Sequence, residues 1–224
     1  MRIDIVTGFP KLLTGPLNES MIRQAKRKKI VRVKVHDLRK YTHDRHKTID
    51  DTPYGGGAGM VLKPEPIFEC VEYLRSRRKY DEVVYLTADG EKLNQKIANE
   101  LSLKENMIFL CGHYKGIDER VRERLVTREI SIGDYVLTGG ELAACVLADA
   151  VIRLIPGVLG DGESLLTDSF QENLLGAPQY TKPASYKSMD VPGVLLNGNH
   201  KEIERWRRNQ QQERTQKRRK DLLS

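Results

Sequence analysis

The sequence predicts an α/β fold with a largely parallel sheet. Short segments with the alternating or continuous apolar pattern of β-strands are separated by stretches with apolar residues at helical spacing. Three of the strand-like segments run directly into loops that contain glycine, and open α/β sheets bind ligands beyond such strand ends. The chain has 224 residues, enough for a sizeable core, and suggests either one large domain or a domain with an appendage.

The first part of the chain predicts two strands, a helix and a long loop. Residues 2–7 and 31–36 alternate between apolar and polar side chains, and residues 13–25 have near-helical spacing. Residues 41–59 are polar and contain four glycines, which match neither the Walker nor the Rossmann spacing. Because long loops in compact domains are often functional, we expect this loop to face a substrate.

A metal site at the histidines and disulfide bonding are not expected. His43 and His46 lie near several Asp residues, but no further His or Cys nearby completes a zinc pattern. The cysteines, Cys70, Cys111 and Cys145, form no CxxC pair and are typical of free thiols in a reducing cytosol.

The chain also lacks the patterns of export and membrane insertion. It begins directly with strand-like alternation, so no signal peptide is expected. No apolar run approaches the roughly 18 residues that a membrane span needs. We therefore expect a soluble, cytoplasmic protein.

The middle of the chain continues the alternation of strands and helices. Helical spacing covers residues 64–78 and 93–101, and strand-like runs cover residues 82–87 and 106–111. The second of these strands leads into a turn over residues 112–120, where another helix is expected to begin.

A glycine-rich junction follows the last predicted strand. The strand-like run of residues 130–136 meets Thr138, Gly139, Gly140 and Glu141, and a helical pattern starts at once. Thr138 and Glu141 have the spacing of a capping box. The paired glycines allow a ligand to approach the backbone. A pocket for a small polar ligand and an ordinary strand-to-helix loop both satisfy this spacing.

The remainder predicts a buried helix, a linker and a basic helix. Residues 141–154 are nearly all apolar, although Asp149 and Arg153 lie four positions apart and could neutralise each other. Residues 160–169 are small, polar and acidic, which is typical of a linker. Residues 199–220 have the pattern of one basic helix.

The charge distribution points to a polyanionic partner. The formal net charge is +7. Residues 23–40 hold nine Lys and Arg against one Asp, a balance of +8, and residues 201–220 hold nine against three Glu, a balance of +6. A single basic run is most often a solvated helix face, but two such runs together favour nucleic acid.

Six motifs, in order and with matching spacing, give the chain a resemblance to a known family. They are Asp50-Asp51 with Pro53-Tyr54-Gly55-Gly56-Gly57, Cys111-Gly112 with Gly116-Ile117-Asp118-Glu119-Arg120, Ser131 to Glu141, Ile155-Pro156-Gly157-Val158-Leu159-Gly160, Asp168-Ser169-Phe170, and Gly198-Asn199-His200. Through nearly its whole length the chain resembles the bacterial tRNA (guanine-N1)-methyltransferases, knotted SPOUT enzymes that modify guanosine 37 next to the anticodon.

The resemblance implies a domain organisation and an assembly. Residues 1–160 would form a trefoil-knotted SPOUT methyltransferase domain, residues 161–172 an interdomain linker, and residues 173–224 a small helical tRNA-binding domain. The family also implies a homodimer whose active site lies at the subunit interface.

The resemblance further implies S-adenosylmethionine as the methyl donor, held bent in the knot mainly by backbone groups. Small residues in the matching loops agree with recognition by the backbone. Mg²⁺ is a further candidate that the sequence neither requires nor excludes. The residues that match the donor-binding loops of the family are Tyr85, Leu86, Thr87, Gly112, Ile132, Gly133, Asp134, Tyr135, Val136, Leu137, Gly139 and Gly140.

Two charged residues match the catalytic positions of the family. Guanine N1 carries a proton at neutral pH, and a nearby carboxylate can remove it as general base. Asp168 matches that base, and Arg153 matches the cation that stabilises negative charge on the O6 side of the ring. Without the resemblance, Asp168 would be interpreted as a solvated linker acid.

Two departures from the family pattern are visible. The family commonly has Gly-Arg-Tyr-Glu-Gly where this chain has His113 and Lys115 between the glycines, so neither residue is assigned to the site. The chain also ends soon after its basic helix, and we expect a reduced tRNA-binding domain.

Two alternative functions remain at this point. A knotted methyltransferase acting on a ribose 2′-hydroxyl would need a different activating group from Asp168. A non-catalytic RNA-binding protein would use the two basic segments and leave the glycine-rich pocket without a role. A donor-binding titration distinguishes the RNA-binding protein from the two methyltransferases. Mapping the methylated atom distinguishes the two methyltransferases from each other.

Overall fold

The computed structural model describes residues 1–159, 168–170 and 172–223. By its internal contacts the chain divides into two compact units, Met1–Gly160 and Asp161–Ser224, and each unit is considered by itself. Most of the predicted linker lies outside the described residues. The division into a catalytic domain, a linker and a tRNA-binding domain stays a prediction.

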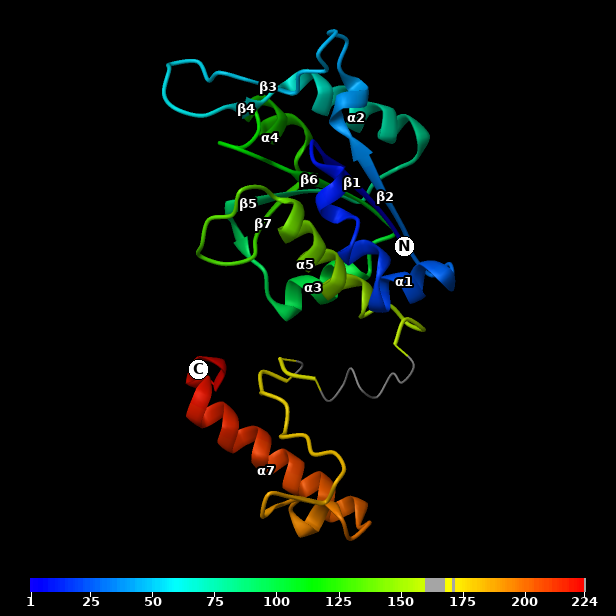
Figure 1. Cartoon of the computed structure of the whole chain (residues 1–224), viewed down its shortest axis with the longest axis vertical. Helices are drawn as coiled ribbons and strands as arrows, with labels where there is room; N and C mark the ends of the chain where they lie inside the picture. Colours follow the sequence, from blue (N-terminus) through cyan, green and yellow to red (C-terminus); the bar gives the residue numbers. More distant parts are fainter. Residues whose placement is uncertain (160–167, 171, 224) are drawn as a thin grey trace. The chain divides into compact units, whose positions relative to one another are not determined.

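The first unit is built on a parallel sheet, which confirms the predicted α/β class (Figure 1). The strand order is β2-β1-β6-β5-β7, and each neighbouring pair is parallel. The strands are β1 (Arg2–Thr7), β2 (Arg32–Asp37), β5 (Glu82–Lys92), β6 (Asn106–Cys111) and β7 (Arg128–Ser131).

Helices cover both faces of this sheet (Figure 1). One layer contains α1 (Ser20–Arg27), α3 (Gln95–Ser102) and α5 (Glu141–Ile152), and the other contains α2 (Pro64–Arg77) and α4 (Glu119–Leu125). Side chains alternate along β1, so Ile5 joins the first layer and Val6 the second. Both faces are buried along β1 and β6, as is usual for parallel strands.

Three helices of the first unit begin at residues that suit a helix start. Asn94 accepts a hydrogen bond from Ile97 N at 3.0 Å at the start of α3. Asp118 accepts one from Arg120 N at 3.0 Å at the start of α4. α2 starts with Pro64, whose missing N–H group is not needed in the first turn.

The segment after β1 is more irregular than the helical spacing of residues 13–25 predicts. Two 3₁₀ turns, η1 (Pro10–Leu13) and η2 (Pro16–Asn18), precede α1. Pro16 cannot donate a backbone hydrogen bond inside a helix, which explains the interruption.

The polar loop of residues 41–59 follows η3 (Leu38–Tyr41) and is closed by a short hairpin of β3 (Asp50–Asp51) and β4 (Val61–Leu62). Backbone bonds join its end to the loop after β6. Lys115 N donates to Met60 O at 3.0 Å, and Leu62 N donates to Gly116 O at 3.0 Å.

Two strand predictions need correction. β5 continues to Lys92 with a register shift after Leu86, although residues beyond Thr87 were expected to form a loop. β7 ends at Ser131, whereas the predicted strand extended to Val136. Gly133 follows with φ 146°, a conformation that ends regular pairing and that few other residues adopt.

The chain crosses the sheet between β7 and α5. β7 is an edge strand, but α5 packs against β1 and β6, which lie beyond β5 in the sheet. Residues 132–140 therefore pass the carboxyl ends of β5 and β6. The trefoil knot itself stays a prediction.

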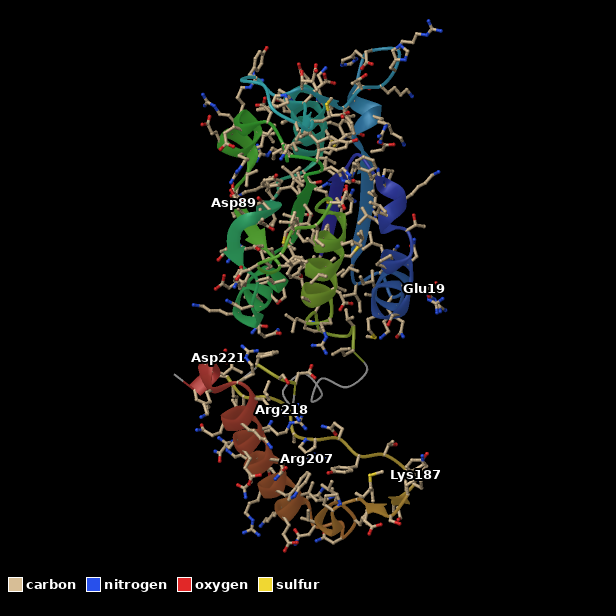
Figure 2. The ribbon with its side chains drawn as sticks, turned by 60° about the vertical axis from the view of Figure 1, so that its left-hand side comes forward. Glu19, Asp89, Lys187, Arg207, Arg218 and Asp221 are labelled. Atoms are coloured by element: carbon tan, nitrogen blue, oxygen red, sulfur yellow. The ribbon has the colours of Figure 1, made fainter. Side chains whose placement is uncertain are left out.

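The second unit is organised around α7 (His200–Arg218), with Asn199 as its N-cap. Thr215 of α7 is buried and accepts a hydrogen bond from Leu175 N at 2.9 Å. Figure 2 shows Arg207 and Arg218 along this helix. The remaining elements are β8 (Ser185–Tyr186), β9 (Met189–Asp190), η4 (Gly193–Leu195) and η5 (Lys220–Leu223).

None of the helices in the described part of the chain combines the length and apolar character of a membrane span.

Candidate active site

A pocket of about 280 Å³ opens beyond the carboxyl ends of the central strands. It brings together eleven of the twelve predicted donor-binding residues: Tyr85, Leu86, Thr87, Gly112, Ile132, Gly133, Tyr135, Val136, Leu137, Gly139 and Gly140. Asp134 does not line it, and its carboxylate lies 2.6 Å from Lys92 Nζ at the surface. Most of the residues that match the donor-binding loops of the family thus line one pocket, while donor binding by them stays a prediction.

Gly140 lies against protein backbone as well as the pocket. Its N–H donates to Gly112 O at 2.7 Å. A Cβ atom at Gly140 would lie 3.0 Å from Cys111 Cα and 3.2 Å from Gly112 N. The glycine thus allows the crossing segment to pack onto the end of β6, a reason that the sequence pattern did not reveal.

The predicted capping box is wrong. The N-cap of α5 is Gly140, and no side chain caps the helix there. The Glu141 carboxylate is buried instead, where it accepts a 2.6 Å hydrogen bond from Thr7 Oγ1 and lies 3.5 Å from His113 Nδ1. A buried carboxylate needs such partners, so these contacts take precedence over a cap.

His113 completes this buried wall of the pocket. Its ring stacks on Phe9 with centroids 4.0 Å apart. A Cβ at Gly139 would come within 2.3 Å of His113 Nδ1, so only glycine leaves room for the ring. Thr7 Oγ1 also accepts a bond from Phe9 N at 2.8 Å. These contacts tie the pocket loops to the end of β1, and no local sequence signal indicated Thr7.

Asp89 supplies negative charge at the rim of the pocket. Hydrogen bonds from Thr87 Oγ1 and from Arg122 Nη2, the latter at 2.8 Å, lower the pKa of Asp89. Burial raises the pKa of the neighbouring Tyr85, whose ring lies 5.6 Å from the Arg122 guanidinium carbon. Asp89 is labelled in Figure 2. Sequence reasoning placed it in a loop and gave it no role.

The two predicted catalytic residues belong to different units. Arg153 is the C-cap of α5 in the first unit and is partly buried. Asp168 belongs to the second unit, where it lines a cavity with Glu204, Arg207 and other residues of α7. Their catalytic roles stay predictions.

No group of three or more His, Cys, Asp or Glu side chains that could hold a metal ion occurs among the described residues. His43 pairs with Glu69 at 2.8 Å on the surface.

The first unit is an α/β domain with a pocket beyond the carboxyl ends of its parallel strands, the position at which open α/β sheets usually bind ligands. The family model described as tRNA (Guanine-1)-methyltransferase TrmD matches residues 1–224. The chain therefore belongs to the tRNA (guanine-1)-methyltransferase family, as the motifs predict.

Relatives agree with this assignment over their full length. The tRNA (guanine-N(1)-)-methyltransferase of Christiangramia forsetii is 58% identical over 223 residues, which cover 100% of this chain and 99% of the relative. The proteins of the same name from Flavobacterium psychrophilum and Bacteroides thetaiotaomicron are 57% and 55% identical, with the same coverage.

Proposed function

We propose that this methyltransferase transfers the methyl group of S-adenosylmethionine to N1 of guanosine 37 in tRNA. Residues 1–160 form the donor-binding catalytic domain, residues 161–172 the linker, and residues 173–224 the tRNA-binding domain. The chain acts as a homodimer in which each active site takes residues from both protomers. The main support for this proposal, and for the shared site in particular, is the distance between Arg153 and the pocket, which lie at opposite ends of α5.

The pocket suits a donor that is recognised through the backbone. A side chain at Gly112, Gly139 or Gly140 would clash with neighbouring protein atoms, so this wall of the pocket presents little side-chain bulk to a ligand. Asp89 at the rim offers a carboxylate to the amino group of a methionine moiety. When bound, S-adenosylmethionine supplies the electrophilic methyl group.

Arg153 and the pocket lie at opposite ends of one helix. Gly140 lines the pocket immediately before α5, and Arg153 follows the last residue of this 12-residue helix. At 1.5 Å per residue the two backbones are about 20 Å apart, which exceeds the reach of an arginine side chain. A single chain therefore does not bring Arg153 to its own donor pocket.

The exposed face of α5 offers a way to join them. Leu142 and Val146 are 51% and 47% exposed, and with Asp149 and Arg153 they form one stripe on an otherwise buried helix. If two copies pair these stripes antiparallel about a two-fold axis, Arg153 of one protomer faces the partner's Leu142. That position adjoins the partner's pocket.

In the proposed reaction, two side chains act on the guanine. The Asp168 carboxylate accepts the N1 proton, so that the N1 electron pair is free to attack the methyl carbon. Arg153 stabilises the negative charge that develops toward O6. The proposal assigns no residue to Mg²⁺.

The second unit is proposed to hold the tRNA. Exposed cations run along α7, among them Lys201, Arg205 and Arg208. Such side chains neutralise phosphates without reading sequence. The Asp168 cavity borders the same helix, which supports a role for Asp168 beside this surface.

Mixed dimers test the shared site. Arg153→Ala and Gly140→Val are each expected to abolish methylation of an unmodified tRNA transcript when present in both protomers. Equal mixing should restore roughly a quarter of the sites, because each heterodimer has one donor pocket with an intact partner arginine. Product nucleosides are identified to show methylation at N1 and at position 37.

The fold and the exchange of protomers are checked by circular dichroism and by capture of a tagged protomer. No recovery in mixtures that do form heterodimers contradicts the shared site. Methylation of a ribose hydroxyl contradicts the proposed chemistry.

A further inference from the structure

The carboxyl end of α1 carries a group of exposed cations that the proposed active site does not use. The α1 cluster consists of Arg23, Arg27, Lys28 and Lys29. In the described part of the chain, the one acidic side chain paired with it is Glu19, 3.4 Å from Arg23. The cluster therefore presents a local excess of positive charge.

Lys29 adopts a backbone conformation that is unfavourable for lysine. At the end of α1, Ile30 N donates to Ala25 O at 3.0 Å, and Lys29 N donates to Lys26 O at 3.0 Å. These two bonds define a Schellman motif, whose left-handed position is usually glycine. Lys29 occupies it with φ 60°. The helix dipole favours cations in the last turn, but it does not favour lysine over glycine in this conformation.

The α1 cluster lies at the same end of the first unit as Arg153. α1 leads from the carboxyl end of β1 back to the amino end of β2, and it packs beside α5. Lys28 Nζ donates to Gly157 O at 2.9 Å, four residues beyond Arg153 in the chain. RNA that brings a base to Arg153 would therefore approach the first unit at the end where this cluster lies.

We propose that the α1 cluster binds the phosphate backbone of the tRNA, as an RNA surface separate from α7. The inference rests on the proposed function in taking tRNA as the substrate and Arg153 as a residue that meets the target base. Lys and Arg side chains are the usual partners of nucleic-acid phosphates. An anionic membrane would also attract them, but stable surface binding needs an exposed apolar helix face. Ile22 and Ala25 of α1 are buried in the core.

Lys29→Gly gives a test in which stability and binding change in opposite directions. Glycine removes the charge and relieves the left-handed strain, so the thermal unfolding midpoint should stay unchanged or rise. Affinity for an unmodified tRNA transcript should fall. Adding Arg27→Gln should weaken binding further, and the slope of log Kd against log salt should decrease by about one for each phosphate that is no longer neutralised.

A matched control removes the same charge elsewhere in the first unit. Lys96→Gln with Arg124→Gln replaces two exposed cations on α3 and α4. This protein should bind tRNA with nearly the wild-type affinity and salt slope. Affinity for S-adenosylmethionine should be unchanged in both double variants.

An unchanged salt slope in Arg27→Gln with Lys29→Gly overturns the proposal. An equal loss in the control also overturns it, since the effect then follows total charge. Reduced association with phosphatidylglycerol vesicles together with unchanged tRNA binding would assign the cluster to a membrane surface instead. These experiments measure tRNA binding, whereas the mixed dimers measure catalysis. The proposal for the α1 cluster and the proposed function can therefore fail independently of each other.

Discussion

Asp168 is the single residue on which the proposed reaction depends most directly. Asp168→Asn keeps the shape of the side chain but cannot accept the N1 proton at neutral pH. Single-turnover methylation with saturating tRNA should fall by roughly 10²–10⁴-fold, the usual contribution of a positioned base. Affinity for S-adenosylmethionine should stay near the wild-type value, because the pocket proposed for the donor lies in the first unit.

The neighbouring acid Glu172 provides a control for Asp168. It is exposed and lines the same cavity, and Glu172→Gln should leave the single-turnover rate almost unchanged. A near-normal rate in Asp168→Asn would remove this residue from the mechanism. A parallel loss of rate, folding and donor affinity would indicate a structural role.

Asp4 is a buried carboxylate that does not line the pocket and that has a structural role. Its carboxylate accepts hydrogen bonds from Arg2 Nη2 at 2.8 Å and Tyr80 Oη at 2.7 Å, and His36 Nε2 lies at 2.7 Å. Burial alone would raise the pKa of Asp4, but these hydrogen bonds outweigh it and hold the pKa well below its usual range.

Replacing Asp4 tests this network. Asp4→Asn should lower the free energy of unfolding at pH 7 by roughly 3–5 kcal/mol, since Arg2 loses a buried partner. The folded-state pKa lies below the unfolded value of about 3.9, so the stabilisation is fully present above that pH and is lost as the pH falls below it. Urea unfolding at pH 7, 5 and 3 measures the difference between the two proteins.

Asp44→Asn is the control for Asp4, because its carboxylate is hydrogen-bonded to Thr48 but exposed. It should have little effect at any of these pH values. A difference between wild type and Asp4→Asn that stays the same at pH 3 would contradict the assignment.

Glu141 shows why some site residues could not be predicted. Its spacing from Thr138 satisfies the rule for a capping box, which considers four neighbouring residues. The partner that decides its position is Thr7, 134 residues earlier in the chain. Only the folded sheet brings these two residues together, and a local pattern contains no information about that contact.

At the scale of elements, the sequence predicted best where periodicity and burial agree. β1, β6, α2 and α5 were expected within a few residues of their observed bounds, because their apolar side chains point into the core. The prediction of a strand up to Val136 was wrong because it depended only on the apolar content of the segment. Val136 is 91% exposed, in a segment whose path is set by packing against β6.

The exposed cations of α7 are predicted to bind tRNA. Lys201, Arg205 and Arg208 lie at positions i, i+4 and i+7, on one exposed face. Replacing all three with Gln should weaken tRNA binding and reduce the salt slope by about one for each phosphate left without its cation. Donor affinity should not change. Deleting residues 201–224 is less informative, since Thr215 supports the rest of the unit.

A charge-preserving variant is the control for this helix. Lys201→Arg, Arg205→Lys and Arg208→Lys together should retain the salt slope. If the three Gln substitutions also retain it, α7 is a solvated surface, and tRNA binding lies elsewhere.

At the scale of the whole molecule, the exposed stripe of α5 decides between a monomer and a dimer. An exposed stripe that includes the apolar side chains of Leu142 and Val146, on an otherwise buried helix, is typical of an interaction surface. The same stripe ends in Arg153, which cannot reach the pocket of its own chain. A substitution that disrupts this stripe should therefore abolish both dimer formation and methylation.

Val146→Asp tests this link, because it places a charge in the middle of the stripe, where burial against a partner would leave it unpaired. Sedimentation should show a monomer, methylation should be abolished, and circular dichroism should be unchanged. Leu103→Asp is the control, since Leu103 is 85% exposed and lies outside the stripe, at the end of α3. It should leave both assembly and methylation intact. A monomeric Val146→Asp protein that still methylates tRNA would show that one chain holds a complete active site, and Arg153 would then have no part in the reaction.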